Sequence, residues 1–279
     1  GAIGSGETHK SGGFIQTHWE EVREVRLIAW SRDVFQHWAE RIGGDCGFVR
    51  GGYLHVTGTA READVRAVHR MLLDERLESV WLEPAELAEL QPALDVQGLV
   101  GGAWEPSSGW ADPTATTRGF AEAARRQGAR IDDATTVTRI CHEHGRITGV
   151  ETSRGFIACR AVVLAAGPWT ATLHPAALPP LPIVLERGQV CYMSRPDGLP
   201  ARELGFYDEV LGLYTHPDGD TNLVGKDYPF DRVLVPDQYK RDLDDNYLLV
   251  ARLALAYRFP SLVASQLVRG VTGLYDFTP

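Results

Sequence analysis

A short apolar run that stops at a glycine constrains the fold of this chain more than any other stretch. Residues 161–169 read AVVLAAGPW, and the consecutive Val162, Val163 and Leu164 predict a strand buried on both faces. Gly167 lets the backbone just past that strand approach another group closely. Ligands of α/β proteins bind beyond the carboxyl ends of such strands, so the run predicts a ligand site, although an ordinary buried strand ended by a turn would read the same way.

The segment before this run predicts a helix followed by three antiparallel strands. Asp112 can cap a helix that has Pro113 in its first turn. Residues 135–160, TTVTRICHEHGRITGVETSRGFIACR, then alternate between β-forming stretches and two tight turns, around Gly145 and Gly155. A helix and a meander that lead into a buried strand are typical of a mixed α/β fold.

Apolar spacing predicts further elements on both sides of this segment. Three- and four-residue steps predict helices over residues 22–42 (one long helix or a pair), 61–78 and 238–257, and a short helix from Pro84. Alternation and turn residues predict antiparallel strands over residues 181–193 and 212–224. Helices that alternate with strands, followed by antiparallel strands, imply two domains between which the chain crosses several times.

Several stretches, in order, resemble one known family. They include GAIGSGETHKSGG at residues 1–13, WEPSSGWADP at 104–113, the meander with its AVVLAAGPW ending, LERGQVCYMS at 185–194 and GLYDFTP at 273–279. Together they resemble the superfamily of FAD-dependent D-amino acid oxidases and sarcosine oxidases, and within it the branch of sarcosine oxidase beta subunits and related amine dehydrogenases. The resemblance implies a p-hydroxybenzoate-hydroxylase-like α/β flavoprotein with a split, Rossmann-like FAD domain and an antiparallel-sheet substrate domain.

The resemblance also implies where the two domains lie in the sequence. The FAD-binding domain is expected to comprise residues 1–50, 107–180 and 266–279, and the substrate domain residues 51–106 and 181–265.

Both ends of the sequence depart from that family's pattern. The family begins with a strand and a G-x-G-x-x-G turn that holds the pyrophosphate, whereas the opening Gly1-Ala2-Ile3-Gly4-Ser5-Gly6 lacks the spacing and the preceding strand. The family also continues beyond the equivalent of Pro279 into a glycine-rich strand and a helix. We therefore expect an internal piece of a longer flavoprotein that, by itself, binds FAD weakly or not at all.

By resemblance, three separate stretches contact FAD. Small residues such as Gly12 and Gly13 allow a backbone to lie against a flat ring system. The expected contacts are Ser5, His9, Lys10, Ser11, Gly12, Gly13, Phe14, Val137, Ala166, Gly167 and Trp169. His9 and Lys10 either donate to the flavin or are surface loop residues, and Trp169 packs on the cofactor or fills the core. Gly273 stands where single-chain sarcosine oxidases attach flavin through a cysteine, so FAD is expected to be non-covalent at this position.

The family removes hydride from the carbon next to an amine nitrogen and delivers it to the flavin. Many relatives clamp the substrate carboxylate with an arginine, but the two positions that resemblance assigns to it read Gln16 and Tyr275. Tyr214 and His216 either line the substrate pocket or pack within the sheet. These four residues are the catalytic candidates, and their lack of a fixed positive charge favours a secondary, N-methylated or bulkier amine over glycine.

A charge for a substrate carboxylate could still come from elsewhere, from Arg187, Arg50 or Lys226. The implied function is FAD-dependent oxidation of the C–N bond of a small amine or amino acid of the sarcosine, glycine, D-amino acid or proline type. Two alternatives remain. The chain could be a non-catalytic flavoprotein-like subunit or scaffold, or it could be a dehydrogenase that passes electrons to a partner subunit or another acceptor protein.

Composition argues against other classes of protein. A net charge of −9 with dispersed Lys and Arg argues against a nucleic-acid surface. No apolar run approaches the roughly 20 residues that span a bilayer, and no secretory signal is visible at the start. We therefore expect no membrane or nucleic-acid partner.

Cysteine spacing argues against a metal or a disulfide framework. The four cysteines, at positions 46, 141, 159 and 191, show no C-x-x-C spacing and are expected to be reduced thiols in a cytoplasmic protein. The tetrad Cys141-His142-Glu143-His144 could be taken for a metal cluster. Because alternate residues of a strand point to opposite faces, it is read as a solvated hairpin turn, and no metal is expected.

Overall fold

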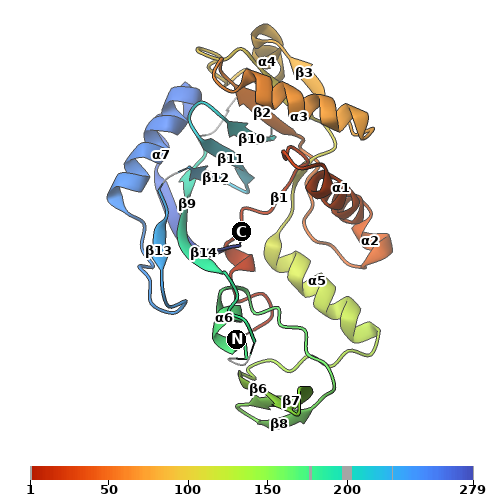
Figure 1. Cartoon of the computed structure of the whole chain (residues 1–279). Coiled ribbons are helices and arrows are strands. Elements are labelled where there is room, and N and C mark those ends of the chain that lie inside the picture. The colour runs from red at the N-terminus through yellow and green to blue at the C-terminus, as the bar shows by residue number, and fades with distance from the viewer. Residues whose placement is uncertain (1, 176–177, 197–202, 228, 279) are drawn as a thin grey trace.

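The computed structural model describes residues 2–175, 178–196, 203–227 and 229–278, and a large sheet occupies its centre (Figure 1). The sheet has nine strands in the order β13-β9-β12-β11-β10-β2-β4-β3, with β14 also paired to β9. Its strands are β2 (Tyr53–Thr57), β3 (Val80–Leu82), β4 (Gly101–Glu105), β9 (Val184–Ser194), β10 (Gly205–Asp208), β11 (Leu213–Asp218), β12 (Thr221–Lys226), β13 (Asp231–Val233) and β14 (Leu267–Phe277). All these pairings are antiparallel except β10 with β2, so the predicted antiparallel strands are confirmed.

The predicted helices are present, with adjusted ends. They are α1 (Val22–Gln36) and α2 (Trp38–Arg41), which form the expected pair, α3 (Glu62–Asp74), α4 (Pro84–Leu90), α5 (Pro113–Arg126), α6 (Thr170–Leu173) and α7 (Asp245–Arg258). Asp112 caps α5 as predicted, since its carboxylate accepts hydrogen bonds from the backbone N–H groups of Thr114 and Ala115. Single 3₁₀ turns η1 (Thr8–Lys10), η2 (Gly167–Trp169) and η3 (Pro260–Leu262) complete the helical elements.

The helix α7 begins seven residues later than the sequence pattern indicates. The carbonyls of residues 240–242 accept hydrogen bonds from Arg187 and Thr272, side chains of two sheet strands. Carbonyls held in this way do not enter the helical ladder, and the first helical residue is Asp245.

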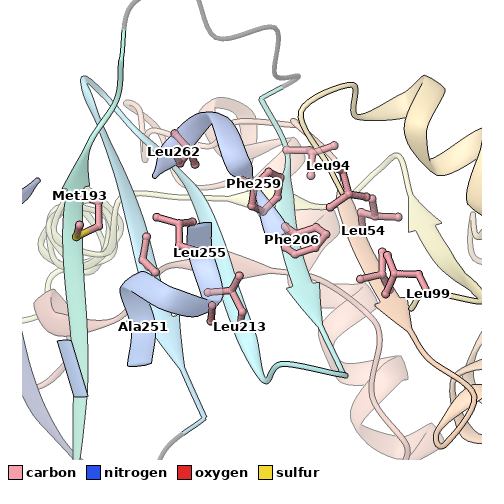
Figure 2. Close-up of a cluster of buried hydrophobic side chains, with 14 of the residues drawn as sticks. Leu54, Leu94, Leu99, Met193, Phe206, Leu213, Ala251, Leu255, Phe259 and Leu262 are labelled. Carbon is pink, nitrogen blue, oxygen red and sulfur yellow. The ribbon is translucent and has the colours of Figure 1, made fainter. Parts of the chain in front are cut away.

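The main core lies between α7 and the large sheet. Figure 2 shows Ala251 and Leu255 of α7 facing Leu213 and Met193 of the sheet, with Phe206 and Phe259 beside them. Leu255 and Phe206 are among the fully buried side chains of this cluster. Because burial of such a side chain stabilises a fold by about 1.5–3 kcal/mol, this face fixes α7 on the sheet.

A buried ion pair ties the C-terminal end of α7 to the end of β10. Arg258 Nε donates to Asp208 Oδ2 at 2.6 Å, and neither side chain is exposed to solvent. The other carboxylate oxygen, Oδ1, accepts the backbone N–H groups of Val210 and Leu211. Arg258 also donates to the carbonyls of residues 95 and 97, so the pair links three segments.

The meander lies at the end of the molecule opposite α3 and α4 (Figure 1). Its strands β6 (Val137–Glu143), β7 (Arg146–Thr152) and β8 (Gly155–Ala158) are antiparallel and joined by the two predicted turns. The tetrad at residues 141–144 occupies the first hairpin. The described residues contain no group of three or more His, Cys, Asp or Glu side chains that could hold a metal ion.

The predicted buried strand at Val162–Leu164 is wrong. Residues 161–166 have no regular structure, and the side chain of Val163 is 92% exposed. A strand needs a neighbour for its backbone N–H and C=O groups, and no strand within the described residues pairs with this run. Among the helices of the described ranges, none is both long and apolar enough to cross a membrane.

Candidate functional site

The loop that precedes β1 (Phe14–Ile15) is held against β5 (Gly109–Trp110) by its backbone. Ala111 N donates to Gly13 O at 2.9 Å. Gly13 has φ +67°, and a Cβ atom at this position would lie 2.1 Å from Ala111 O. Only glycine fits, because both the left-handed backbone and the close carbonyl exclude a side chain.

His216 fastens the same loop to the large sheet. Its Nε2 lies 2.7 Å from Gly12 O, and its Nδ1 lies 2.7 Å from Pro217 O. The imidazole stacks on Trp110, with ring centroids 5.0 Å apart, and meets the ring of Phe14 edge-on. Burial lowers the pKa of His216. The side chain contacts the back of the loop and is not among the residues that line the cavity described next.

A cavity of about 380 Å³ lies between this loop and the sheet. One wall is formed by Lys10, Ser11, Gly12, Gly13 and Phe14. The facing walls include three of the catalytic candidates, Gln16, Tyr214 and Tyr275. The structure thus brings together segments that lie more than 250 residues apart in the sequence.

The two tyrosines of the cavity lie over glycines of neighbouring strands. A Cβ atom at Gly225 would come within 1.8 Å of the ring of Tyr214, and one at Gly188 within 2.3 Å of the ring of Tyr275. The missing side chains let the rings lie flat along the sheet at the cavity wall. Burial, with Tyr275 close by, raises the pKa of Tyr214 well above its usual value, so its hydroxyl stays protonated and can donate a hydrogen bond.

Gln16 presents an amide to both the backbone and the cavity. Its Oε1 accepts the backbone N–H of His18 at 2.6 Å. The amide N–H groups are therefore the part of this side chain that is left for another partner.

Arg187 lines the cavity, but its guanidinium is committed to other groups. Only 2% of the side chain is exposed. Its N–H groups donate to the carbonyls of Lys240 and Asp242 and to the side chains of Asp231, Asp244 and Gln189. Hydrogen bonds from Arg187 and Lys240 lower the pKa of Asp244 to about 2, so this partner stays ionised. Arg187 is therefore not available as a carboxylate clamp.

The other two charged alternatives differ from each other. Arg50 donates to Pro106 O and to Ser107 Oγ and does not line the cavity. Lys226 does line the cavity, where its Nζ donates to the carbonyl of Asp227 at 2.8 Å. Lys226 is thus the better placed cation for an anionic ligand group.

The remaining predicted flavin residues lie outside this cavity. Ser5 is exposed, and His9 Nδ1 lies 2.5 Å from Gly6 O in the same exposed loop. Val137 is the first residue of β6, which contacts α6, the helix that directly follows η2.

Three of the predicted flavin residues lie in or beside η2. Ala166 directly precedes this turn, and Gly167, at φ +51°, and Trp169 belong to it. Trp169 donates its indole N–H to Asp237. Both η2 and η1 contact β14, so two of the three predicted flavin segments lie beside one strand.

Several cavity residues were missed by sequence reasoning. They are Trp19, Tyr53, Tyr207 and Asp227. Tyr207 donates its hydroxyl to Asp227 Oδ2 at 2.7 Å, and burial, together with this carboxylate, raises the pKa of the tyrosine. Aromatic residues that alternate along a strand are also typical of ordinary sheet packing, so no local signal set these residues apart.

Comparison with known proteins identifies the family. Residues 1–279 match the family model described as FAD dependent oxidoreductase (DAO). The chain belongs to this family. The resemblance inferred from the sequence is thereby confirmed, and FAD is the cofactor on which the family depends.

Individual DAO-family relatives are distant. The mouse pyruvate dehydrogenase phosphatase regulatory subunit is 28% identical over 72% of this chain and 23% of its own length. The sarcosine oxidase subunit beta of Rhodobacter capsulatus is 26% identical over 60% of this chain and 42% of its own length. The chain therefore spans less than half the length of either relative.

A solved structure shares the fold. The L-proline dehydrogenase from P. horikoshii superposes with a TM-score of 0.88 over 99% of this chain and 73% of that chain, at 22% identity. The mixed α/β, DAO-type fold expected from the sequence is confirmed.

Proposed function

We propose that this protein oxidises the C–N bond of a small amine or amino acid, with FAD as the electron acceptor. The observation that carries the proposal is the 380 Å³ cavity between the Ser11–Phe14 loop and Tyr214, Tyr275 and Gln16. These groups come from the stretches that resemblance assigns to flavin and substrate binding. When bound, FAD supplies the electron sink for removal of hydride from the carbon next to the amine nitrogen.

The loop wall fits a flat ring system. Gly12 and Gly13 expose backbone rather than side chain at the cavity, and His216 holds this backbone in place. We propose that Ser11–Phe14 contact the flavin ring, and that Val137 and residues 166–169 contact other parts of FAD. The contact of η1 with α5 supports a FAD-binding domain that includes residues 1–50 and 107–180. β14 contacts η1 and η2 and also pairs with β9 of the substrate sheet, so we propose that residues 266–279 join the two domains.

The substrate wall is polar and aromatic. Tyr214 can donate a hydrogen bond from a hydroxyl that stays protonated, and Gln16 can donate from its amide. Tyr275, over Gly188, presents a ring face against which an N-alkyl group can pack. We propose that these three residues hold the substrate and that Lys226 meets any anionic end of it.

An anaerobic titration of the purified full-length protein tests the function. Visible flavin absorption should bleach on addition of sarcosine, proline or a larger N-methylated amine, and more slowly with glycine. Absorption that persists with every amine of the panel would contradict oxidation. It would favour the non-catalytic alternative, to which the printed name of the mouse relative, a regulatory subunit, lends support.

The electron acceptor is tested with the same amines in air. Peroxide release at the rate of amine consumption indicates an oxidase. Reduction of an added dye without peroxide indicates a dehydrogenase that passes electrons to a partner protein.

Replacing Gln16 by arginine should raise the affinity for small amino acids. A charge-assisted hydrogen bond to the carboxylate is worth roughly 1.5–3 kcal/mol, which corresponds to a gain of about tenfold or more. The measurement is the Kd for glycine and sarcosine, from the change in flavin absorption. Gln16→Met is the matched control, because it keeps the length of the side chain without a donor. Efficient turnover of glycine by the wild type, with no response to Gln16→Arg, would place the clamp elsewhere.

A further inference from the structure

A second cavity, of about 510 Å³, adjoins the first. Four residues line both of them: Gln16, Trp19, Tyr53 and Tyr207. Three of the four are aromatic. The two cavities therefore lie next to each other, separated by no more than these four side chains.

The second cavity carries an excess of negative charge. The acidic residues that line it are Glu20, Glu21, Glu24, Asp64 and Glu209. Arg61 is the one lysine or arginine among its described lining residues, and its guanidinium contacts three of these carboxylates, those of Glu20, Asp64 and Glu209 at 3.0–3.2 Å. Because one cation is shared by three acids, the field in the cavity remains negative.

His18 adds a buried acceptor to the same cavity. Its side chain is 4% exposed, and neither ring nitrogen has a hydrogen-bond partner. Burial lowers the pKa of His18 well below its usual value, and its ring lies against that of His55, with centroids 4.1 Å apart. A neutral imidazole, with Nδ1 3.7 Å from Glu105 Oε1, keeps one lone pair without a hydrogen-bond donor.

Aromatic rings in the second cavity add to its attraction for a cation. His55 Nε2 lies 2.9 Å from Glu209 Oε2, and its ring centroid lies 4.8 Å from that of Tyr207. Ring faces of tyrosine and tryptophan attract cations, and carboxylates do so more strongly. A carboxylate or phosphate in this cavity would face five acids.

We propose that the second cavity binds a positively charged group of the substrate, so that the substrate class is a diamine whose second ammonium lies several bonds from the reacting nitrogen. This rests on the proposed function, because it assigns the reacting end to the first cavity. The shared aromatic wall would enclose the alkyl chain between the two nitrogens.

Calorimetric titration of the full-length protein with 1,4-diaminobutane and with butylamine tests the proposal. We expect the diamine to bind about tenfold or more tightly than the monoamine, and this preference to fall as salt is raised. The double variant Glu21→Gln and Glu24→Gln removes two exposed charges that line the cavity, and it should weaken diamine binding about three- to tenfold while butylamine binding is unchanged. The matched control is Glu40→Gln with Glu122→Gln, two exposed acids on α2 and α5 that should leave both affinities unchanged.

A second variant tests the buried imidazole. His18→Phe keeps the ring and removes the acceptor, so it should lower the affinity for the diamine and not that for butylamine. Equal affinities for the two amines, or equal losses in the cavity and control variants, would overturn the proposal. Tight diamine binding without flavin bleaching would support the cation site and contradict the proposed oxidation. Oxidation of monoamines with no preference for the diamine would support the proposed oxidation and contradict the cation site.

Discussion

Replacing Arg258 by methionine should lower the free energy of unfolding by about 3–5 kcal/mol. The substitution removes the partner of Asp208, whose carboxylate is fully buried and lies 2.6 Å from Arg258 Nε. An unpaired charge in such a place is far more costly than the intact pair is stabilising. The variant also frees the carbonyls of residues 95 and 97, which the guanidinium joins to α7. Urea unfolding, followed by circular dichroism, measures the difference in the free energy of unfolding between the wild type and the variant.

Two further variants show whether the pair itself is responsible. Arg252→Met changes an exposed arginine on the same helix and should alter the stability by no more than about 0.5 kcal/mol. Asp208→Asn combined with Arg258→Met removes the unpaired charge and can keep an oxygen acceptor for the N–H groups of Val210 and Leu211, so it should be more stable than Arg258→Met alone. If Arg258→Met had the same free energy of unfolding as Arg252→Met, the Arg258–Asp208 pair would be solvated rather than buried.

Replacing Gly13 by alanine should displace the loop that forms one wall of the cavity. The added methyl group would lie 2.1 Å from Ala111 O, and the backbone would have to hold φ +67° with a side chain attached. Strain of this kind costs about 1–3 kcal/mol, and the close contact adds to it. On the proposed function, flavin affinity of the full-length protein should fall at least about tenfold, measured by flavin fluorescence in a titration.

The neighbouring glycine provides the control. The atoms nearest to a Cβ atom at Gly12 would belong to side chains, the ring of Phe14 at 3.2 Å and Leu223 at 3.5 Å, and the backbone there has no positive φ. Side chains can shift by such amounts, so Gly12→Ala should bind flavin with nearly the wild-type affinity. Equal losses of flavin affinity in the two variants would mean that the loop tolerates no side chain at either position. Wild-type affinity in both would show that this loop does not contact the flavin.

Local signals predicted the local elements of this fold well. Asp112 with Pro113 marked the start of α5 because a cap acts within one turn of the chain. The run at Val162–Leu164 failed for the opposite reason. Its apolar residues indicate burial, but a strand also needs a neighbouring strand for its backbone hydrogen bonds. No local pattern says which segment pairs with it. The predicted start of α7 was wrong for a similar reason. The side chains of Arg187 and Thr272, which are distant in the sequence and belong to no local pattern, donate hydrogen bonds to the carbonyls that precede the helix.

The candidate site was predictable mainly through the resemblance. It placed the Ser11–Phe14 loop, Gln16, Tyr214 and Tyr275, which lie far apart in the sequence, and all of them line one cavity. The residues that were missed, such as Tyr207 and His18, have no distinctive spacing. The position of Tyr207 depends on the parallel pairing of β10 with β2, which joins residues about 150 positions apart, and no periodicity encodes such a pairing. His18 lies against His55 of the same β2 strand.

The cavity has one wall from residues 10–16 and another from residue 275, and this sets an order of events during protein synthesis. While a ribosome is still translating the segment that contains Tyr275, the nascent chain can form the meander and the α5 helix but not the enclosed cavity. β9 can pair with β12 and β13 before β14 is made, but its ten residue pairs with β14 form only afterwards. Loading of a ligand into the complete cavity is therefore a step that follows translation of β14.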